Sequence, residues 1–361
     1  LYQSFSIINA IWIKSNFALI QKIAKQSEVE RIFYNSPIQG ADPVEIDRDV
    51  ILNSRDSSVW GIKRMNADDV WALGFKGQGI VVGGQDTGYG WQVPGIKEKY
   101  RGWNGSIADH NYSWHDAIHD WHPLHTDSIN PCGLDVNYPC DDNGHGTHTI
   151  GTMVASDSIV NFGVAPNAQW IGCRNMERGW GSPQSYIECF EWFLAPTDLN
   201  NQNPDPIKSP HVINNSWSCP TIEGCDSSNF FLMEQAVENL RMAGVVVVVS
   251  AGNSGPNCHT VQTPSAIFDR SFSVGALHWN DTIASFSSRG SVMIDSSNRT
   301  KPNVTAPGVA TTSYMTVGDG SSNWNYANAS GTSMAGPHVA GLVALMISAD
   351  SSLAGDVNRI E

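Results

Sequence analysis

The sequence lacks several features that mark specialised classes of protein. It contains no run of 18 or more apolar residues, so we expect no segment that spans a membrane. It has no internal repeat and no low-complexity segment, which argues against repeat and fibrous architectures. Basic residues are few, since 21 Lys and Arg face 35 Asp and Glu and give a net charge of −14. This acidic balance argues against a nucleic-acid partner.

The chain also lacks a recognisable targeting segment, and it begins with Leu1 rather than Met. No charged stretch followed by an apolar stretch precedes the body of the sequence. We therefore expect any targeting segment to lie outside this sequence. At 361 residues with 41% hydrophobic residues, the chain can bury a large core.

Seven cysteines favour an oxidising compartment, because two pairs lie close in sequence. Cys132 with Cys140 and Cys219 with Cys225 could each close a short surface loop. Zinc is the alternative for closely spaced cysteines, but the sequence has no C-x-x-C pair, which disfavours it. The remaining three are an odd number, so at least one thiol has no partner within this sequence: Cys173, Cys189 and Cys258.

The first 35 residues have the pattern of a small α+β unit. Residues 5–13 are rich in strand formers, Ser15 and Asn16 can cap a helix that continues to Ala24, and residues 29–34 favour a second strand. Residues 35–58 are polar and contain Pro, Gly and several Asp, which predicts an exposed linker open to proteolysis. A domain boundary is expected there.

From Trp60 onward the pattern changes to alternating buried strands and helices. The apolar run 79–84 predicts a strand that ends at Asp86, and the valine run 245–249 predicts one that leads to Asn253. In doubly wound sheets, chemistry takes place at the carboxyl ends of such strands. Three further elements are predicted: helix 186–194 after the Ser-Pro pair 182–183, strand 211–215, and helix 228–243 closed by a glycine.

Ser333 is the candidate nucleophile, because it lies at the start of an apolar helix that follows Gly331. The positive end of a helix dipole favours an attacking alkoxide and the oxyanion it creates, although Thr332 or Ser333 could also simply cap the helix. His145 and Asp86 stand at the ends of other predicted elements. An imidazole can take the proton of a serine, and a carboxylate can orient that imidazole.

Four sequence blocks resemble the signature blocks of the subtilisin-like serine peptidases, and they occur in that family's order. They are QDTG at 85–88, HGTH at 145–148, SAGN at 250–253 and GTSMA at 331–335. The resemblance extends over roughly residues 60–350. The Trp- and His-rich insertion 103–142 and the Cys219–Cys225 pair resemble the bacillopeptidase F branch most.

The resemblance implies a role for each matching residue. Ser333 would be the nucleophile, His145 the general base and then acid, Asp86 the carboxylate that orients it, and Asn253 the oxyanion-hole donor. The second histidine of the block, His148, is structural in the family.

The same resemblance places Ser216, Trp217 and Ser218 on the strand that pairs with the substrate backbone. Ser218 replaces the family's usual glycine, which would narrow the pocket. Gln85 replaces an aliphatic residue before the aspartate. Neither difference implies loss of activity.

The implied fold is α/β, a subtilisin-like three-layer fold with a mainly parallel central sheet, preceded by a small α+β remnant. We assign residues 1–50 to a partial inhibitor-like propeptide, 51–58 to a linker and 59–361 to a catalytic domain shorter than the family's at its C-terminal end. Any other small α+β extension is the alternative for the first segment.

The implied function is that of a secreted, monomeric serine endopeptidase that acts on proteins or peptides and is inhibited by its own propeptide until that is removed. No cofactor is needed for catalysis. Structural calcium is possible without assigned ligands, and the family's His-Pro-Asp is absent around residues 92–96, which weakens one such site.

Two other classes of function stay open. One is a catalytically silent subtilase fold used as a binding module. The other is a metal-binding extracellular protein built on the insertion's histidines, although nearby loop prolines and glycines favour a surface loop and no metal ligand is assigned: His115, His119, His122 and His125.

Overall fold

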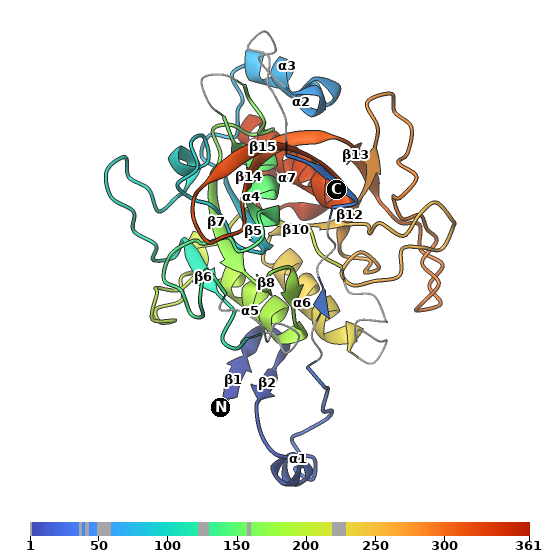
Figure 1. The fold of residues 1–361 in the computed structure, drawn as a ribbon. Helices are drawn as coiled ribbons and strands as arrows, with labels where there is room; N and C mark the ends of the chain where they lie inside the picture. Colours follow the sequence, from blue (N-terminus) through green and yellow to red (C-terminus); the bar gives the residue numbers. More distant parts are fainter. Residues whose placement is uncertain are drawn as a thin grey trace.

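A parallel sheet of seven strands forms the centre of the computed structural model (Figure 1), which describes residues 2–35, 38–39, 43–48, 59–121, 130–156, 160–218 and 229–361. Within these ranges the strand order is β13-β12-β11-β10-β5-β7-β6, and every neighbouring pair is parallel. The strands are β5 (Val81–Asp86), β6 (Trp114–Asp116), β7 (Gln169–Arg174), β10 (Val212–Asn215), β11 (Val246–Ser250), β12 (Phe272–Leu277) and β13 (Val304–Pro307).

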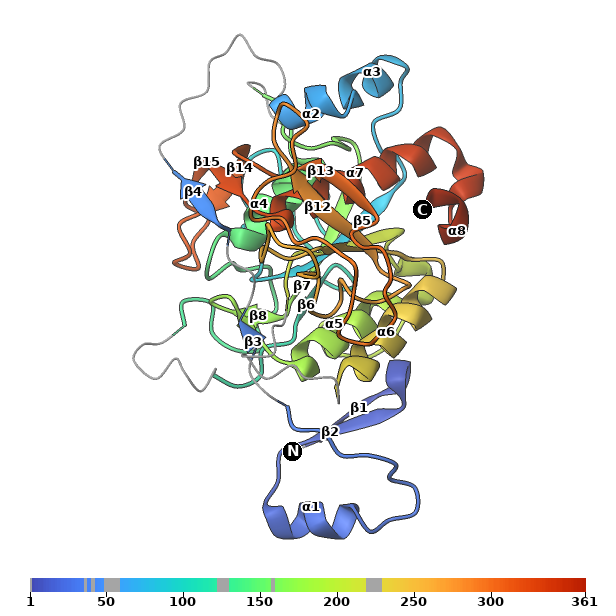
Figure 2. The ribbon, with the colours of Figure 1, turned by 90° about the vertical axis from the view of Figure 1, so that its right-hand side faces the viewer.

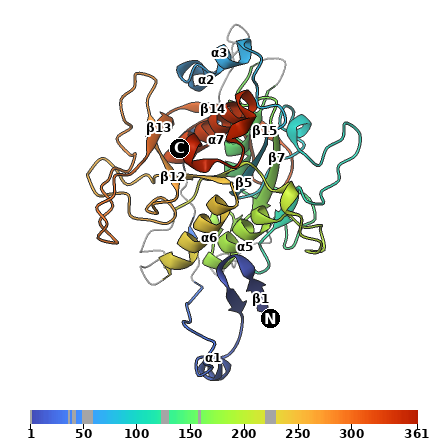
Figure 3. The ribbon, with the colours of Figure 1, turned by 180° about the vertical axis from the view of Figure 1, so that it is seen from behind.

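Helices cover both faces of this sheet and produce the predicted three layers. The valines of β11 alternate between two cores: Val246 and Val248 lie in one, and Val247 and Val249 in the other. The first core includes residues of α4 (His145–Val154) and α7 (Thr332–Ala349), and the second includes residues of α5 (Pro183–Leu194) and α6 (Phe230–Met242). A strand buried on both faces is therefore apolar throughout, as its sequence predicts. Figure 3 shows α5 and α6 together on their side of the sheet.

The strand order reverses beside β5. After β5 the chain adds β6 and β7 on one side, and β10 to β13 follow on the other. The carboxyl ends of β5 and β10 therefore lie side by side at a topological switch point, where open α/β sheets bind ligands. Asp86 is the last residue of β5, and Ser216 follows β10 directly.

A row of buried amide side chains crosses the sheet at this edge. Asn175 Nδ2 donates to Gln85 Oε1 at 2.9 Å, and Gln85 Nε2 donates to Asn215 Oδ1. Asn215 Nδ2 in turn donates to the carbonyl oxygen of Val248 at 2.9 Å. This amide row joins β7, β5, β10 and β11, which gives the unusual Gln85 a structural reason.

Smaller elements surround the sheet. The β14–β15 hairpin packs against α4, and the β8–β9 hairpin follows β7. Their bounds and those of the other elements are β8 (Met176–Glu177), β9 (Trp180–Gly181), β14 (Thr311–Thr316), β15 (Trp324–Ser330), α2 (Trp60–Arg64), α3 (Ala67–Ala72), α8 (Val357–Ile360), and the 3₁₀ turns Lys97–Lys99, Pro206–Lys208 and Ser351–Leu353.

The predicted helices agree with the structure at their capped ends. Helix α5 starts with Pro183 after Ser182, whose side chain accepts from Ser185 N in a capping box. Gly244 has a φ of 88° just after α6, a conformation that suits glycine. Helix α7 is long and apolar enough to cross a membrane by length and composition alone. However, 78% of the helix is buried inside the protein, as expected of a core helix.

The N-terminal segment differs from its prediction in two places. The expected strand 5–13 is a hairpin of β1 (Tyr2–Phe5) and β2 (Ala10–Ile13), joined by the 3₁₀ turn Ser6–Ile8. Residues 29–34 form no strand, so that prediction was wrong; these residues are mostly exposed and have no neighbouring strand to pair with among the described residues. The helix α1 (Phe17–Ile23) is present and is capped by Asn16, as predicted.

The hairpin, rather than α1, attaches this segment to the body (Figure 2). Phe5, Ile7 and Ile8 are buried in the core that contains α5 and α6. Glu191 on α5 accepts hydrogen bonds from the backbone amides of Ser6 and Ile7. Helix α1 has no buried residue.

The predicted linker contains two short strands. Strand β3 (Ile38–Gln39) pairs antiparallel with β9, and β4 (Glu45–Asp47) pairs antiparallel with β15. The pairing of these two strands was not predicted, whereas residues 44–48 are exposed, as expected of the linker. Residues 51–58 lie outside the described part of the chain.

The structure contains one predicted disulfide and one that was not predicted. Cys132 and Cys140 are bonded, which confirms the short loop, and Cys173 of β7 is bonded to Cys189 of α5. Cys258 is free and exposed. Cys219 and Cys225 lie outside the described residues.

Candidate active site

Asp86 and His145 form a buried pair at the switch point. Asp86 Oδ1 lies 2.7 Å from His145 Nδ1, and their side chains are 1% and 5% exposed. The same carboxylate also accepts from Thr87 N at 2.8 Å and from Thr149 Oγ1 at 3.2 Å. Asp86 can therefore fix His145 in the tautomer that carries its proton on Nδ1, which leaves Nε2 for proton transfer.

The glycine after His145 is required by close packing. A Cβ atom at Gly146 would lie 2.1 Å from the carbonyl oxygen of Gly88, on the loop that follows Asp86. This contact brings the start of α4 against the end of β5. It explains why glycine follows histidine in this block.

Asp141 stabilises the same region, a role that was not predicted from the sequence. Its Oδ1 accepts from Gly144 N at 2.7 Å and from Thr87 Oγ1 at 3.0 Å, and its Oδ2 accepts from Thr147 N at 3.0 Å. Asp141 thus joins the loop after Asp86 to the start of the His145 helix. This role could have been predicted from the position of Asp141 just before the start of α4, because an acidic side chain there can accept hydrogen bonds from the free amides of the helix.

Ser333 is the second residue of α7, which packs against α4. Its side chain is buried, and its Oγ donates to the carbonyl oxygen of Ser216 at 3.2 Å. Ser216 Oγ donates back to the carbonyl oxygen of Ser333 at 2.9 Å. The end of β10 therefore holds the start of α7. Gly331 occupies the N-cap without a side-chain cap bond, so the alternative that Thr332 or Ser333 caps the helix was wrong.

Asn253 presents an unused donor beside this helix start. Its Oδ1 accepts from both the backbone amide and the Oγ1 of Thr332, each at 2.9 Å. Its Nδ2 is buried and has no hydrogen-bond partner among the described residues. A Cβ atom at Gly331 would lie 3.5 Å from this Nδ2, so the donor faces the chain just before Ser333. A buried amide donor left without a partner is costly unless a ligand uses it.

The residues predicted to pair with a substrate backbone are mostly buried. Trp217 is 1% exposed and stacks on Tyr186 with ring centroids 3.8 Å apart. Its ring therefore packs inside the protein. Ser216 is also buried, and Ser218 is half-buried.

The N-terminal segment pairs with the body of the protein at two places near these residues. Ile38 pairs with Gly181 of β9. A Cβ atom at Gly181 would lie 2.6 Å from the carbonyl oxygen of Asn175, whose amide donates to the carbonyl oxygen of Asp86 at 3.0 Å. Val44 N donates to the carbonyl oxygen of Ser330 at 2.7 Å, three residues before Ser333, and Pro43 Cα lies 3.7 Å from the position of a Cβ built on Gly331. Strand β3 therefore pairs next to the end of β5, and β4 pairs next to the start of α7.

Two other histidines near the site are buried. His148 Nε2 lies 3.1 Å from Thr311 O and 3.2 Å from Ala327 O, which ties α4 to the β14–β15 hairpin. Burial lowers the pKa of His148 to about 3 and that of His338 to about 4. Both side chains are therefore neutral at physiological pH and serve the packing of α4 and α7.

The histidines of the insertion form an ion-paired cluster. His115 Nε2 and His119 Nε2 lie 2.8 and 2.9 Å from Glu188 Oε1 on α5. Burial lowers the pKa of His119, but its hydrogen bonds to Glu188 and Asp135 outweigh this and raise it to about 10. Within the described ranges, no three His, Cys, Asp or Glu side chains are arranged to hold a metal ion. His122 and His125 lie outside the described residues.

Comparison with known proteins gives a consistent result. A family model described as "Subtilase family" matches residues 77–359. Bacillopeptidase F of Bacillus subtilis (strain 168) is 32% identical over 98% of this chain and 23% of its own length. Serine protease AprX of the same organism is 37% identical over 60% of this chain and 51% of its own length. Subtilisin DY of Bacillus licheniformis is 31% identical over 80% of this chain and 84% of its own length. The chain thus spans about a quarter of the first of these relatives and about half of the second.

Proposed function

The chain belongs to the subtilase family, and on that basis we propose that it is a serine endopeptidase. The observation that carries this proposal is the buried 2.7 Å contact between Asp86 and His145, on a helix packed against the one that carries Ser333. Three similar bacterial proteins that are named as proteases support the same class of reaction: serine protease AprX, the major intracellular serine protease and M-protease.

Each residue has one task in the proposed reaction. Ser333 Oγ attacks the carbonyl carbon of the substrate peptide while His145 Nε2 takes its proton, and the carbonyl oxygen becomes an oxyanion. Asn253 Nδ2 donates to that oxyanion, and the helix dipole of α7 stabilises its charge. His145 then gives the proton to the leaving amine as the carbon–nitrogen bond breaks. Water, deprotonated by His145, hydrolyses the acyl-enzyme and restores Ser333.

The N-terminal segment is proposed to act as an intramolecular inhibitor and as the first substrate. Strand β3 pairs with β9, next to the end of β5, and β4 pairs with β15, next to the start of the helix that carries Ser333; a peptide substrate would use the same two positions. Cleavage in the segment that joins them would free the site. A propeptide, extracellular action and a monomeric state are part of this proposal, and no cofactor takes part in it.

The test is covalent labelling with a fluorophosphonate, which reacts only with an activated serine. After self-cleavage, we expect mass spectrometry to find one adduct on Ser333. Ser333→Ala should remove the adduct, whereas Ser348→Ala, on the same helix but away from the site, should keep it. A folded protein that does not cleave itself, and that stays unlabelled after another protease has cut away the N-terminal segment, would instead support the silent binding module.

A further inference from the structure

Strand β9 of the β8–β9 hairpin pairs with an extended segment of the chain. Contacts with residues outside the hairpin help to set the position of β9. Strand β9 pairs with β8 on one edge and with Ile38–Gln39 on the other. None of these three strands joins the seven-stranded sheet among the described residues. Single residues connect the hairpin to β7 at one end and to α5 at the other, and contacts with the neighbouring loop add to these two connections.

The turn of this hairpin leaves a backbone amide that needs a partner. Arg178 and Gly179 both have positive φ, 51° and 86°, as in a tight two-residue hairpin turn. In such a turn the amide of the first turn residue is not used by the strand pairing. Asp142 Oδ1 accepts from Arg178 N at 2.9 Å.

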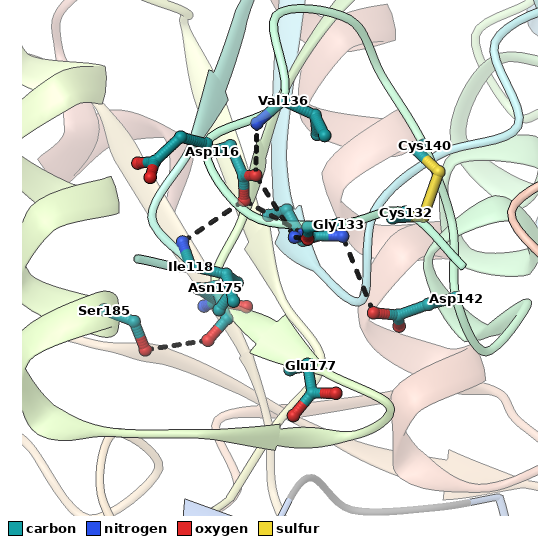
Figure 4. Close-up of polar contacts among 12 residues, drawn as sticks. Asp116, Ile118, Cys132, Gly133, Val136, Cys140, Asp142, Asn175, Glu177 and Ser185 are labelled. Atoms are coloured by element: carbon teal, nitrogen blue, oxygen red, sulfur yellow. Dashed lines mark hydrogen bonds and ion pairs between the residues drawn. A yellow bond between two sulfur atoms is a disulfide. The ribbon is translucent and has the colours of Figure 1, made fainter. Parts of the chain in front are cut away.

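Asp142 is held firmly enough to serve as an anchor. Its side chain is 0% exposed, and its Oδ2 accepts from Asn130 Nδ2 at 2.7 Å and lies 3.6 Å from Arg174 Nη1. Asn130 Nδ2 also donates to Glu177 Oε1 at 2.9 Å, so a second contact reaches the hairpin through the same amide. Figure 4 shows Asp142 and Glu177 near each other, on the side of the group away from Asp116.

Arg174 connects this anchor to the sheet. Its Nε donates to Asp116 Oδ1 at 2.9 Å, its Nη2 donates to the carbonyl oxygen of Gly133, and its side chain is fully buried. Arg174 also lies opposite Asp86 in the β5–β7 pairing. Asp142 itself is three residues before His145. One carboxylate thus links the loop that leads to the candidate general base with the hairpin that would hold the substrate.

We propose that Asp142 is a positioning residue that sets the place of the β8–β9 hairpin and thereby the binding of extended substrates. The proposal rests on the proposed endopeptidase function. Asp142 touches neither the reacting atoms nor the substrate, so its loss should affect substrates according to their length. The value of kcat/KM should fall for substrates long enough to reach β9, and it should not fall for substrates that contact only the Ser333 region.

The experiment uses the self-cleaved protein and a series of fluorogenic peptides with one to five residues before the cut bond. In the unchanged protein, kcat/KM should rise with length. Asp142→Asn keeps the size of the side chain but places an amide against Asn130 and Arg174, and Asp142→Ala removes the acceptor of Arg178 N. We expect each to reduce kcat/KM for the longest peptide about 10-fold or more, mainly through KM. The rate of fluorophosphonate labelling and hydrolysis of the one-residue substrate should change less than about 3-fold.

The matched control is Asp135→Asn, the same change at an exposed aspartate of the same insertion, which should leave the length dependence unchanged. Melting temperatures show which variants fold, and Asp142→Asn decides the question if Asp142→Ala does not fold. An unchanged length dependence in Asp142→Asn, or an equal loss for short and long substrates, would overturn the proposal. If the unchanged protein is neither labelled nor active on any peptide, the endopeptidase function fails instead.

Discussion

The carboxylate of Asp86 and the imidazole of His145 meet at 2.7 Å in a site that excludes solvent from both side chains. Such a pair fixes the tautomer of the histidine and stabilises its cation when it holds the serine's proton. We predict that Asp86→Asn lowers kcat by about 10⁴-fold, because an amide can favour the wrong tautomer. Steady-state kinetics on a short peptide check this, with Thr149→Val as the control that removes a weaker contact to the same carboxylate. A loss under about 10-fold would contradict the role of Asp86.

Asn253 is predicted to act on the transition state rather than on binding. Asn253→Ala should lower kcat by about 10²–10³-fold with little change in KM, the size found for the oxyanion asparagine of a subtilisin. Because Asn253 Oδ1 also accepts from Thr332, Asn253→Asp is the informative partner: it keeps that acceptor and loses the Nδ2 donor. Equal kcat in Asn253→Asp and the unchanged protein would exclude an oxyanion role.

Self-cleavage should depend on Ser333. We expect the purified protein to be cut between Gln39 and Glu45, which are the last residue of β3 and the first residue of β4. Ser333→Ala should stay intact, because it has no nucleophile to form the acyl-enzyme. N-terminal sequencing and intact mass measure both. Cutting of Ser333→Ala at the same bonds, in the absence of any other protease, would argue against this assignment.

Stability should fall in mild acid because of the two buried histidines. Burial lowers the pKa of His148 to about 3 and of His338 to about 4, whereas an unfolded histidine titrates near pH ~6.5. Below that pH the unfolded chain binds protons that the folded protein does not. The contribution of the two histidines to the free energy of unfolding is therefore fully present above about pH 6.5 and decreases toward pH 4. The two sites together give a slope of at most about 2.7 kcal/mol per pH unit.

Urea unfolding of Ser333→Ala at pH 7, 6 and 5 measures this slope without self-digestion. Adding His338→Gln should remove about half of it, because one of the two sites no longer titrates. An unchanged slope after adding His338→Gln would show that His338 is not held neutral.

The disulfide between β7 and α5 should contribute more to stability than the free thiol. Cys173 and Cys189 are 16 residues apart, and removing such a crosslink costs about 3 kcal/mol through the unfolded state. The double variant Cys173→Ala/Cys189→Ala should therefore unfold at lower urea concentration. Cys258→Ala, at the exposed free cysteine, should not change the midpoint. Equal midpoints in both variants would contradict the crosslink.

The fold and the central residues could be predicted because they depend on local patterns. The valine run of β11 and the capped start of α5 are visible in the sequence, and so are the blocks around Asp86, His145 and Ser333. What could not be predicted depends on contacts between distant segments. The pairing of Cys173 with Cys189 needs β7 and α5 to pack first, and residues 29–34 have strand-forming residues but no described neighbour to pair with.

The anchoring role proposed for Asp142 also depends on contacts between distant segments. Nothing in its sequence neighbourhood points to Arg178, 36 residues later, whose amide it accepts. The stacking of Trp217 on Tyr186 also joins distant segments, and the sequence alone did not predict it.

The amide row of Asn175, Gln85 and Asn215 has a consequence for how the sheet assembles. Side chains alternate between the two faces of a strand, so a one-residue slip of β5 would turn Gln85 into the opposite, apolar layer and break its hydrogen bonds to Asn175 and Asn215. Only one alignment of β5 with its two neighbours keeps both of these bonds. The row therefore fixes the register of β5. In this register the end of β5, with Asp86, lies level with the end of β10.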